Sequence, residues 1–296
     1  MPVGPSNFGD LLAPGFRAIF LDKFAQYKEE YSQVFNVLSS TRSYEEDSFV
    51  SGFGLAPIKR VGEAISYADP KQGLDKRYTH VTYGLGFIVN RELAEDDQYG
   101  KIKRMPNSLA RSMRATVETT DANVLNRAFN STYTGADGKE LCATDHPLLG
   151  GGTQKNEPSA GADLSAASFE QALIDIGDTT DDEGLLLALR PMKLVVPTEL
   201  DWTANKILES TLDPESAMNA VNPGKGRMPY MTYHWLTDPD AWFILCEDHE
   251  LNHFWRRKPD FERDNDFDTE NARFKSTMRF DSGWSIPWGI YGSPGA

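Results

Sequence analysis

The stretch YTHVTYGLGFIV, residues 78–89, decides the fold class because its hydrophobic residues recur at every second position. From Val81 to Val89 they alternate with small or polar residues, which is typical of a strand that buries one face. A weaker strand pattern precedes it in DSFVSGFGL, residues 47–55. The sequence therefore predicts a region of β-structure in the first third of the chain.

Between these patterns lies APIKRVGEAISYADPKQGLDKR, residues 56–77, which contains Gly, Pro and charges of both signs. This composition is typical of a long two-stranded excursion outside the core. An isolated hairpin is only marginally stable in water, so we expect the excursion to rest on another subunit. The basic residues expected to contact that neighbour are Lys59, Arg60, Lys71, Lys76 and Arg77.

Amphipathic helices are predicted on both sides of this β-region. In residues 16–31, the rings of Phe16, Phe20 and Phe24 fall on one helical face and need cover, either from this chain's own core or from a neighbouring chain. In the second case these three residues are candidate interface residues. A further helix is predicted from Pro106 to Phe129, forming a rigid spine ~35 Å long.

The second half of the chain mixes helix and strand patterns, which indicates an α/β region within an α+β protein. In order, the sequence predicts a Gly-rich loop over 130–163, a helix over 166–178, a strand over 192–197, a helix capped by Thr198, a strand over 241–246, and a closing strand and hairpin over 271–296.

Composition excludes several classes of protein. The 296 residues are 40% hydrophobic, and 44 acidic against 30 basic residues give a net charge of −14, which opposes tight nonspecific binding to nucleic acid. No apolar run approaches the ~20 residues of a membrane span, and the N-terminus lacks the pattern of a signal peptide. Cys142 and Cys246 lie far apart, which argues against a disulfide framework.

The motif HELNH, residues 249–253, fits the pattern of a zinc peptidase, with His249 and His253 as ligands and Glu250 as general base. Such a site needs a helix that carries both histidines and a third ligand downstream. Only a short segment separates Cys246 from Pro259, and no histidine follows the motif. We therefore expect a short surface helix here, with no metal and no other cofactor.

Four longer stretches carry a resemblance to a known family. They are TDHPLLGGGTQ (144–154), RPMKLVVPTEL (190–200), FWRRKPDFERDNDFDTENARFKSTMRFDSGW (254–284) and GIYGSPGA (289–296). Together with the order of the predicted elements, they resemble the major capsid proteins of tailed bacteriophages, which have the Hong Kong 97-like fold, and more specifically the Mu-type major head subunits.

The resemblance implies an α+β fold divided into an N-terminal arm at 1–45, an extended β-hairpin called the E-loop at 46–88, a P-domain with the spine helix at 89–160 and 262–296, and an α/β A-domain at 161–261. It implies a structural protein and not an enzyme: a major capsid subunit whose pentamers and hexamers form an icosahedral shell around double-stranded DNA.

The partners implied are other copies of this chain, a separate scaffolding protein, a portal and a decoration protein. Packaged DNA would be contacted weakly and without sequence specificity, and no membrane is involved. The expected location is the virion capsid, after assembly in the cytoplasm of the bacterial host. Two alternatives stay open: an encapsulin-like nanocompartment shell that holds enzyme cargo, and a zinc-dependent hydrolase that uses the residues of the HELNH motif.

Overall fold

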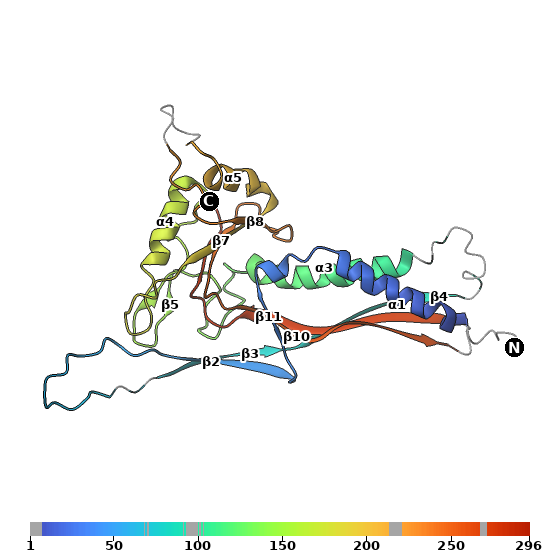
Figure 1. Cartoon of the computed structure of the whole chain (residues 1–296), viewed down its shortest axis with the longest axis horizontal. Coiled ribbons are helices and arrows are strands. Elements are labelled where there is room, and N and C mark those ends of the chain that lie inside the picture. Colours follow the sequence, from blue (N-terminus) through green and yellow to red (C-terminus); the bar gives the residue numbers. More distant parts are fainter. Residues whose placement is uncertain are drawn as a thin grey trace.

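The computed structural model describes residues 8–67, 69, 71–90, 92, 100, 102, 104–212, 221–266 and 271–296. The chain is elongated: a long layer of strands and helices is joined at one end to a wider α/β region (Figure 1). A thin two-stranded excursion projects from the molecule at that same end. No helix in these described ranges is long and apolar enough to cross a bilayer.

A four-stranded sheet with strand order β1-β10-β11-β4 forms the long layer. Strand β1 runs parallel to β10, and the other neighbouring strands are antiparallel. The strands are β1 Asn36–Ser39, β4 Val81–Val89, β10 Leu251–Asn265 and β11 Ala272–Trp284. The strand predicted from the alternation between Val81 and Val89 is confirmed as β4, whereas Tyr78 and Thr79, which precede it in the quoted stretch, belong to β3.

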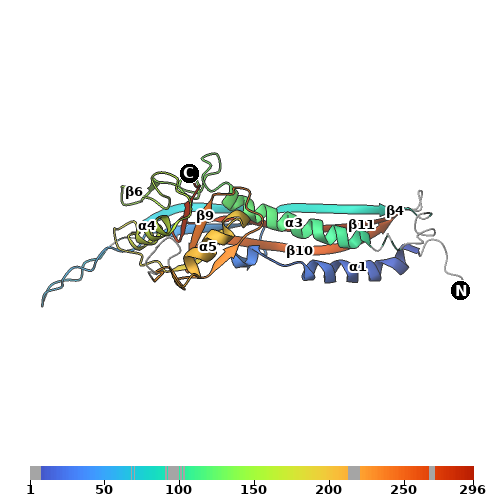
Figure 2. The same cartoon turned by 90° about the horizontal axis from the view of Figure 1, so that it is seen from above.

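Two helices, α1 (Phe8–Gln26) and α3 (Arg104–Asn126), cover one face of this sheet. Figures 1 and 2 show them side by side along β10 and β11. Every second side chain of β11 from Ala272 to Phe280 is buried, so the strand presents a largely apolar face to the helices. Helix α3 confirms the predicted spine, and buries Leu109, Met113, Val117 and Leu125 at helical spacing.

The aromatic stripe of α1 is covered by this chain's own core. Phe16 and Phe20 are 3% and 0% exposed, and their ring centroids lie 5.2 Å from Phe274 and 5.3 Å from Phe261. Phe24 is half-buried. The sequence left open whether this chain or a neighbour buries the aromatic stripe, and the structure shows that this chain does. Phe16 and Phe20, which were candidate interface residues, are therefore core residues.

A second four-stranded sheet, with order β12-β9-β7-β8, forms the α/β region. Its elements are β7 Pro191–Val196, β8 Tyr230–Thr232, β9 Trp242–Cys246, β12 Ile290–Ser293, α4 Ala166–Gly177, α5 Asp201–Leu208 and the short 3-10 helix η3 Thr198–Leu200. The predicted helix at 166–178 and the strands at 192–197 and 241–246 are confirmed. Thr198 does not cap α5, because it starts the 3-10 helix that precedes it. The predicted C-terminal hairpin is wrong, since β12 crosses to this sheet and pairs with β9.

The excursion consists of the antiparallel strands β2 (Tyr44–Val50) and β3 (Gln72–Thr79), followed outward by residues without regular structure. The Gly-rich loop is irregular, as predicted, except for the short ladder of β5 (His146–Pro147) and β6 (Thr153–Gln154).

The HELNH motif does not form the expected surface helix. His249 and Glu250 follow a turn, and β10 begins at the next residue. His253 is completely buried, and its Nδ1 lies 2.9 Å from the Asp121 carboxylate of α3. The two histidines therefore do not share the helix face that the zinc pattern requires, and within the described ranges no group of His, Cys, Asp and Glu residues is placed to hold a metal ion. The zinc interpretation is therefore wrong: His253 is a core residue paired with an acid.

A buried carboxylate joins the arm to the spine helix. Both oxygens of Glu118, in α3, accept backbone N–H bonds, one from Glu30 at 3.0 Å and one from Tyr31 at 2.9 Å, where the 3-10 helix η2 (Tyr31–Gln33) begins. Burial raises the pKa of Glu118 to about 7. The arm is therefore held by an acid that releases its proton near neutral pH.

Glu118→Gln tests the role of Glu118 through the pH dependence of the free energy of unfolding. Because the folded state holds the Glu118 proton between the ordinary pKa of 4.5 and about 7, the free energy of unfolding should fall as pH rises through that window, by at most ~1.4 kcal/mol per pH unit. The variant should show a flatter pH dependence. Urea unfolding of the unassembled subunit at several pH values measures the difference, and parallel curves would contradict this assignment.

His253→Ala tests the buried pair. Removing the imidazole leaves the Asp121 carboxylate buried without its partner, so the free energy of unfolding should fall by about 3–5 kcal/mol. The double variant Asp121→Leu/His253→Leu should regain part of this loss, because no charge is then left unpaired. Urea unfolding and metal analysis check both points; stoichiometric zinc in the wild type that His253→Ala abolishes would contradict the structural role.

Candidate assembly surface

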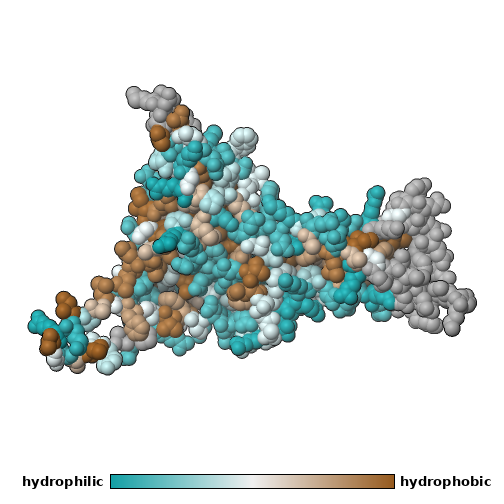
Figure 3. Space-filling model, in the orientation of Figure 1, coloured by the Kyte–Doolittle hydropathy of each residue, from teal (hydrophilic) through white to brown (hydrophobic). Residues whose placement is uncertain are grey.

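The outer part of the excursion, residues 51–67 and here called the tip, carries apolar side chains that this chain does not cover. Ile58 is 93% exposed and Val61 106%. Figure 3 shows hydrophobic and hydrophilic atoms mixed at the end of the excursion, away from the body of the molecule. The other large apolar residues exposed on the tip are Phe53, Leu55, Ile65 and Tyr67. Six large apolar side chains this exposed on one short segment are typical of a surface that another molecule covers.

The five basic residues predicted to contact a neighbour fall into two groups. Lys59, Arg60 and Lys71 are exposed, and among the described residues no acid pairs with their side chains. Lys76 and Arg77, in contrast, are engaged within the chain. The Lys76 ammonium lies 4.9 Å from the ring centroid of Trp284, and burial lowers its pKa.

Arg77 binds Glu46 across the β2–β3 ladder, at 2.7 Å from Nε to the carboxylate, and its guanidinium stacks over the Tyr44 ring. These contacts hold the two strands together close to the body. The free cations are therefore concentrated toward the outer end of the excursion.

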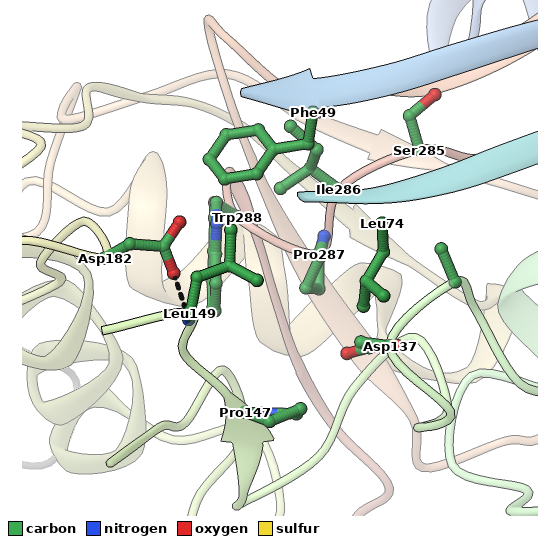
Figure 4. A pocket seen from close by; sticks show the side chains of 11 residues that line it. Phe49, Leu74, Asp137, Pro147, Leu149, Asp182, Ser285, Ile286, Pro287 and Trp288 are labelled. Carbon is green, nitrogen blue, oxygen red and sulfur yellow. Dashed lines mark hydrogen bonds between the residues drawn. The ribbon is translucent and has the colours of Figure 1, made fainter. Parts of the chain in front are cut away.

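A small pocket, here called the root pocket, lies where the excursion joins the body (Figure 4). Its volume is about 50 Å³, well below the ~300–1,000 Å³ of typical small-molecule sites. Strands β2 and β3 and two loops supply the apolar walls, which are formed by Phe49, Leu74, Pro147, Leu149, Ile286, Pro287 and Trp288. A pocket of this size accommodates one side chain and not a cofactor.

Asp182 supplies a carboxylate to the root pocket. Its Oδ1 accepts the backbone N–H of Leu149 at 2.8 Å, as the dashed line in Figure 4 shows. Its Oδ2 is buried and has no hydrogen-bond partner among the residues that the structure describes, and the residue as a whole is 8% exposed. Gly150 permits this geometry, because a Cβ there would lie 2.1 Å from the Asp182 carbonyl oxygen. The pocket therefore contains a buried negative group that is only half satisfied.

Asp137, the other acid of the root pocket, already has a partner. Its Oδ2 lies 2.6 Å from Nδ1 of His146, whose Nε2 lies 3.1 Å from the Asn156 side-chain oxygen. The Asn156 amide nitrogen donates to the Leu141 carbonyl, which fixes the orientation of that amide. Both nitrogens of His146 thus face acceptor oxygens, one from Asp137 and one from Asn156.

The sequence did not reveal the root pocket. Its lining comes from segments that are far apart in the chain, and no sequence pattern indicates that these segments meet. In the part of the chain that the structure describes, no group of His, Cys, Asp and Glu residues is placed to hold a metal ion. The candidate features of this surface are thus a projecting tip and a small pocket at its base that contains two acidic residues.

Comparison with known proteins agrees with this architecture. Residues 73–292 match the family model described as phage capsid protein. A comparison with curated protein sequences finds no match. Among solved structures, the capsid of bacteriophage JBD30 decorated with minor capsid protein trimers is similar with a TM-score of 0.58 and 18% identity, over 72% of this chain and 92% of that one.

Two further structures share the fold. The capsid of the native GTA particle has a TM-score of 0.58 at 12% identity, over 89% of this chain and 90% of that one. The virus-like particle from Pyrococcus furiosus has a TM-score of 0.54 at 10% identity, over 95% and 98%. The family model spans most of the sequence, and the similar structures are capsid and particle shells. The chain therefore belongs to the phage capsid protein family and has the Hong Kong 97-like fold.

Proposed function

We propose that this chain is the major capsid subunit of a phage or prophage head of the Mu type, and that its pentamers and hexamers form an icosahedral shell around double-stranded DNA. Membership of the phage capsid protein family supports a structural role in a shell. The observation that carries the finer proposal is the tip, whose apolar and basic side chains are held away from the subunit's own core.

The domain division implied by the resemblance is part of this proposal, with boundaries adjusted to the sheets. The E-loop would extend from Tyr44 to Thr79, since these residues bound the isolated β2–β3 pair. Strands β4 and β10 would belong to the P-domain together with β11 and α3, and the sheet containing β7 and β9 would be the centre of the A-domain. The N-terminal arm would include α1.

The net charge of −14 supports a container for DNA. A wall that bound packaged DNA through many phosphate contacts would hinder its release, because each neutralised phosphate adds to the affinity. We propose weak contact with DNA, assembly in the host cytoplasm, and a scaffolding protein, a portal and a decoration protein as partners. The last is supported by the JBD30 capsid, which is decorated with minor capsid protein trimers.

An encapsulin-like compartment is the second candidate. The virus-like particle from Pyrococcus furiosus is similar over nearly the full length of both chains. The two candidates differ in what the particle encloses. Particles should be purified from cells that also express the genes flanking the gene for this chain. A phage head should contain double-stranded DNA, whereas an encapsulin-like compartment should contain a stoichiometric protein cargo.

Replacing the tip tests the shell function. The Ser51 N–H bonds to the Lys71 carbonyl at 2.9 Å, so an Asn-Gly turn can join these residues in place of 52–70. The wild type should form megadalton particles, or capsomers if the scaffold is absent, whose formation depends on concentration. The shortened chain should fold with a similar melting temperature but form no particles. Light scattering after size-exclusion chromatography, together with electron microscopy, measures both.

A wild-type chain that stays monomeric at every concentration, with its scaffold supplied, would contradict the capsid proposal. Normal shells from the shortened chain would leave the capsid role intact but would contradict the role of the tip.

A further inference from the structure

Strand β4 forms one margin of the long sheet and has an unpaired outer edge. Its only strand neighbour among the described residues is β11, which pairs with it from Val81 to Val89 without a shift of register. Figure 2 shows β4 along one side of the long layer, with no helix or strand of that layer beyond it. The exposed fractions of Val81, Leu85 and Ile88 are 48%, 50% and 56%. The outer edge of β4 is therefore open to a strand from another molecule.

The opposite margin of the same sheet is protected against such pairing. There β1 pairs with β10 only as far as Trp255. Beyond that point β10 carries three basic residues and a proline at 256–259, where its register with β11 shifts. Charges, proline and bulges of this kind prevent an edge strand from pairing with other chains. Strand β4 has none of these devices, since residues 81–89 contain no charge and no proline.

The sequence of β4, VTYGLGFIV, is close to a palindrome with Leu85 at its centre. When two copies of β4 run antiparallel about a twofold axis at Leu85, each residue lies opposite one of the same kind. The opposite pairs are Val81 with Val89, Thr82 with Ile88, Tyr83 with Phe87, Gly84 with Gly86, and Leu85 with its own copy. Residues that lie directly opposite share one face of the sheet, so this register keeps the apolar face continuous.

The aromatic residues of β4 are only partly covered within the subunit. Tyr83 stacks on Phe280 of β11, with 4.9 Å between the ring centroids. Phe87 stacks on Phe274 in the same way at 5.1 Å, and both β4 rings are half-buried. A second β4 would place another aromatic ring opposite each of them, and such cross-strand pairs stabilise a sheet. Because the chain has a net charge of −14, an uncharged strand also lets two copies meet without opposing like charges at the contact.

We propose that β4 of one subunit pairs antiparallel with β4 of a second copy, about a twofold axis at Leu85, so that the two long sheets become one continuous sheet. The contact is isologous, because both copies contribute the same strand. This inference rests on the proposed shell function and specifies one of its contacts. Rings of subunits need a second kind of contact to join one ring to the next, and a twofold β4 pair supplies it.

Leu85→Cys tests the position of the twofold axis. The two Cα atoms of an opposite pair lie ~4.5–5.5 Å apart, which a disulfide can bridge. The native Cys142 and Cys246 are both buried, so oxidised particles should give covalent dimers, and no longer ladder, on a denaturing gel without reductant. Leu186→Cys, at an exposed leucine of the α/β region, is the matched control and should stay monomeric.

Thr82→Cys and Ile88→Cys test the direction of the pairing. In the antiparallel register, two copies of residue 82 are six positions apart along the strands, which is ~20 Å, and the same holds for residue 88. Neither variant should therefore form dimers alone. Particles assembled from an equal mixture should give a dimer of one chain of each kind, which tags of different length identify on the gel.

Charge variants test the contact without cross-linking. Leu85→Glu and Leu85→Lys each place two like charges opposite each other, so each should raise the lowest subunit concentration that yields particles by about tenfold or more. Since Leu85 is half exposed, the melting temperature of the free subunit should stay close to that of the wild type. An equal mixture of the two variants should assemble at a lower concentration than either alone, because opposite charges then meet. Leu186→Glu should assemble like the wild type.

The outcomes separate this inference from the shell function. Wild-type particles whose Leu85→Cys counterparts give no dimer, or charge variants that assemble like the wild type, would overturn the β4 pair and leave the capsid role intact. Charge variants that fail without mutual rescue, or a Leu85→Cys link to a different protein, would assign this edge to another partner and also overturn it. Failure of the unmodified chain to assemble would instead overturn the proposed function itself.

Discussion

The alternating burial of β11 is the constraint on which the rest of this subunit depends. One face of the central sheet is apolar and has to be covered. Helices α1 and α3, which are far apart in the sequence, both pack on this face. The rings of Phe16 and Phe20 on Phe274 and Phe261 close this layer. Because α3 is thereby fixed on the sheet, Glu118 can hold the end of the arm, and the excursion leaves the body in a defined direction.

The excursion has the opposite character. Two strands cannot bury a core of their own, and β2 and β3 are held mainly by their ladder and by cross-strand pairs such as Arg77 with Glu46. Apolar side chains beyond them increase the free energy of a lone subunit in water and reduce it in an assembly. The subunit thus combines a core that is complete within one chain with a projecting surface that is not.

Sequence patterns predicted the elements with strong periodicity, such as α3, α4, β7 and β9. They failed at β10, because its outward side chains are charged and Pro259 interrupts the pattern. The strand tolerates that proline where the register with β11 shifts, between Arg257 and Asp260. The periodicity of α1 showed that Phe16 and Phe20 are buried but not which chain buries them. The root pocket could not be predicted, since only the fold brings its segments together.

The central claim is that the apolar side chains of α1 are buried by their own chain, whereas those of the tip are buried by a neighbouring subunit. Hydrogen exchange of free and assembled subunits tests this claim most directly. The account predicts that backbone amides in peptides covering 51–67 exchange rapidly in the free subunit and become protected on assembly, while the hydrogen-bonded amides of α1 between Phe16 and Phe24 are already protected before it. Equal exchange of the tip in both states, or protection of α1 that appears only on assembly, would contradict it.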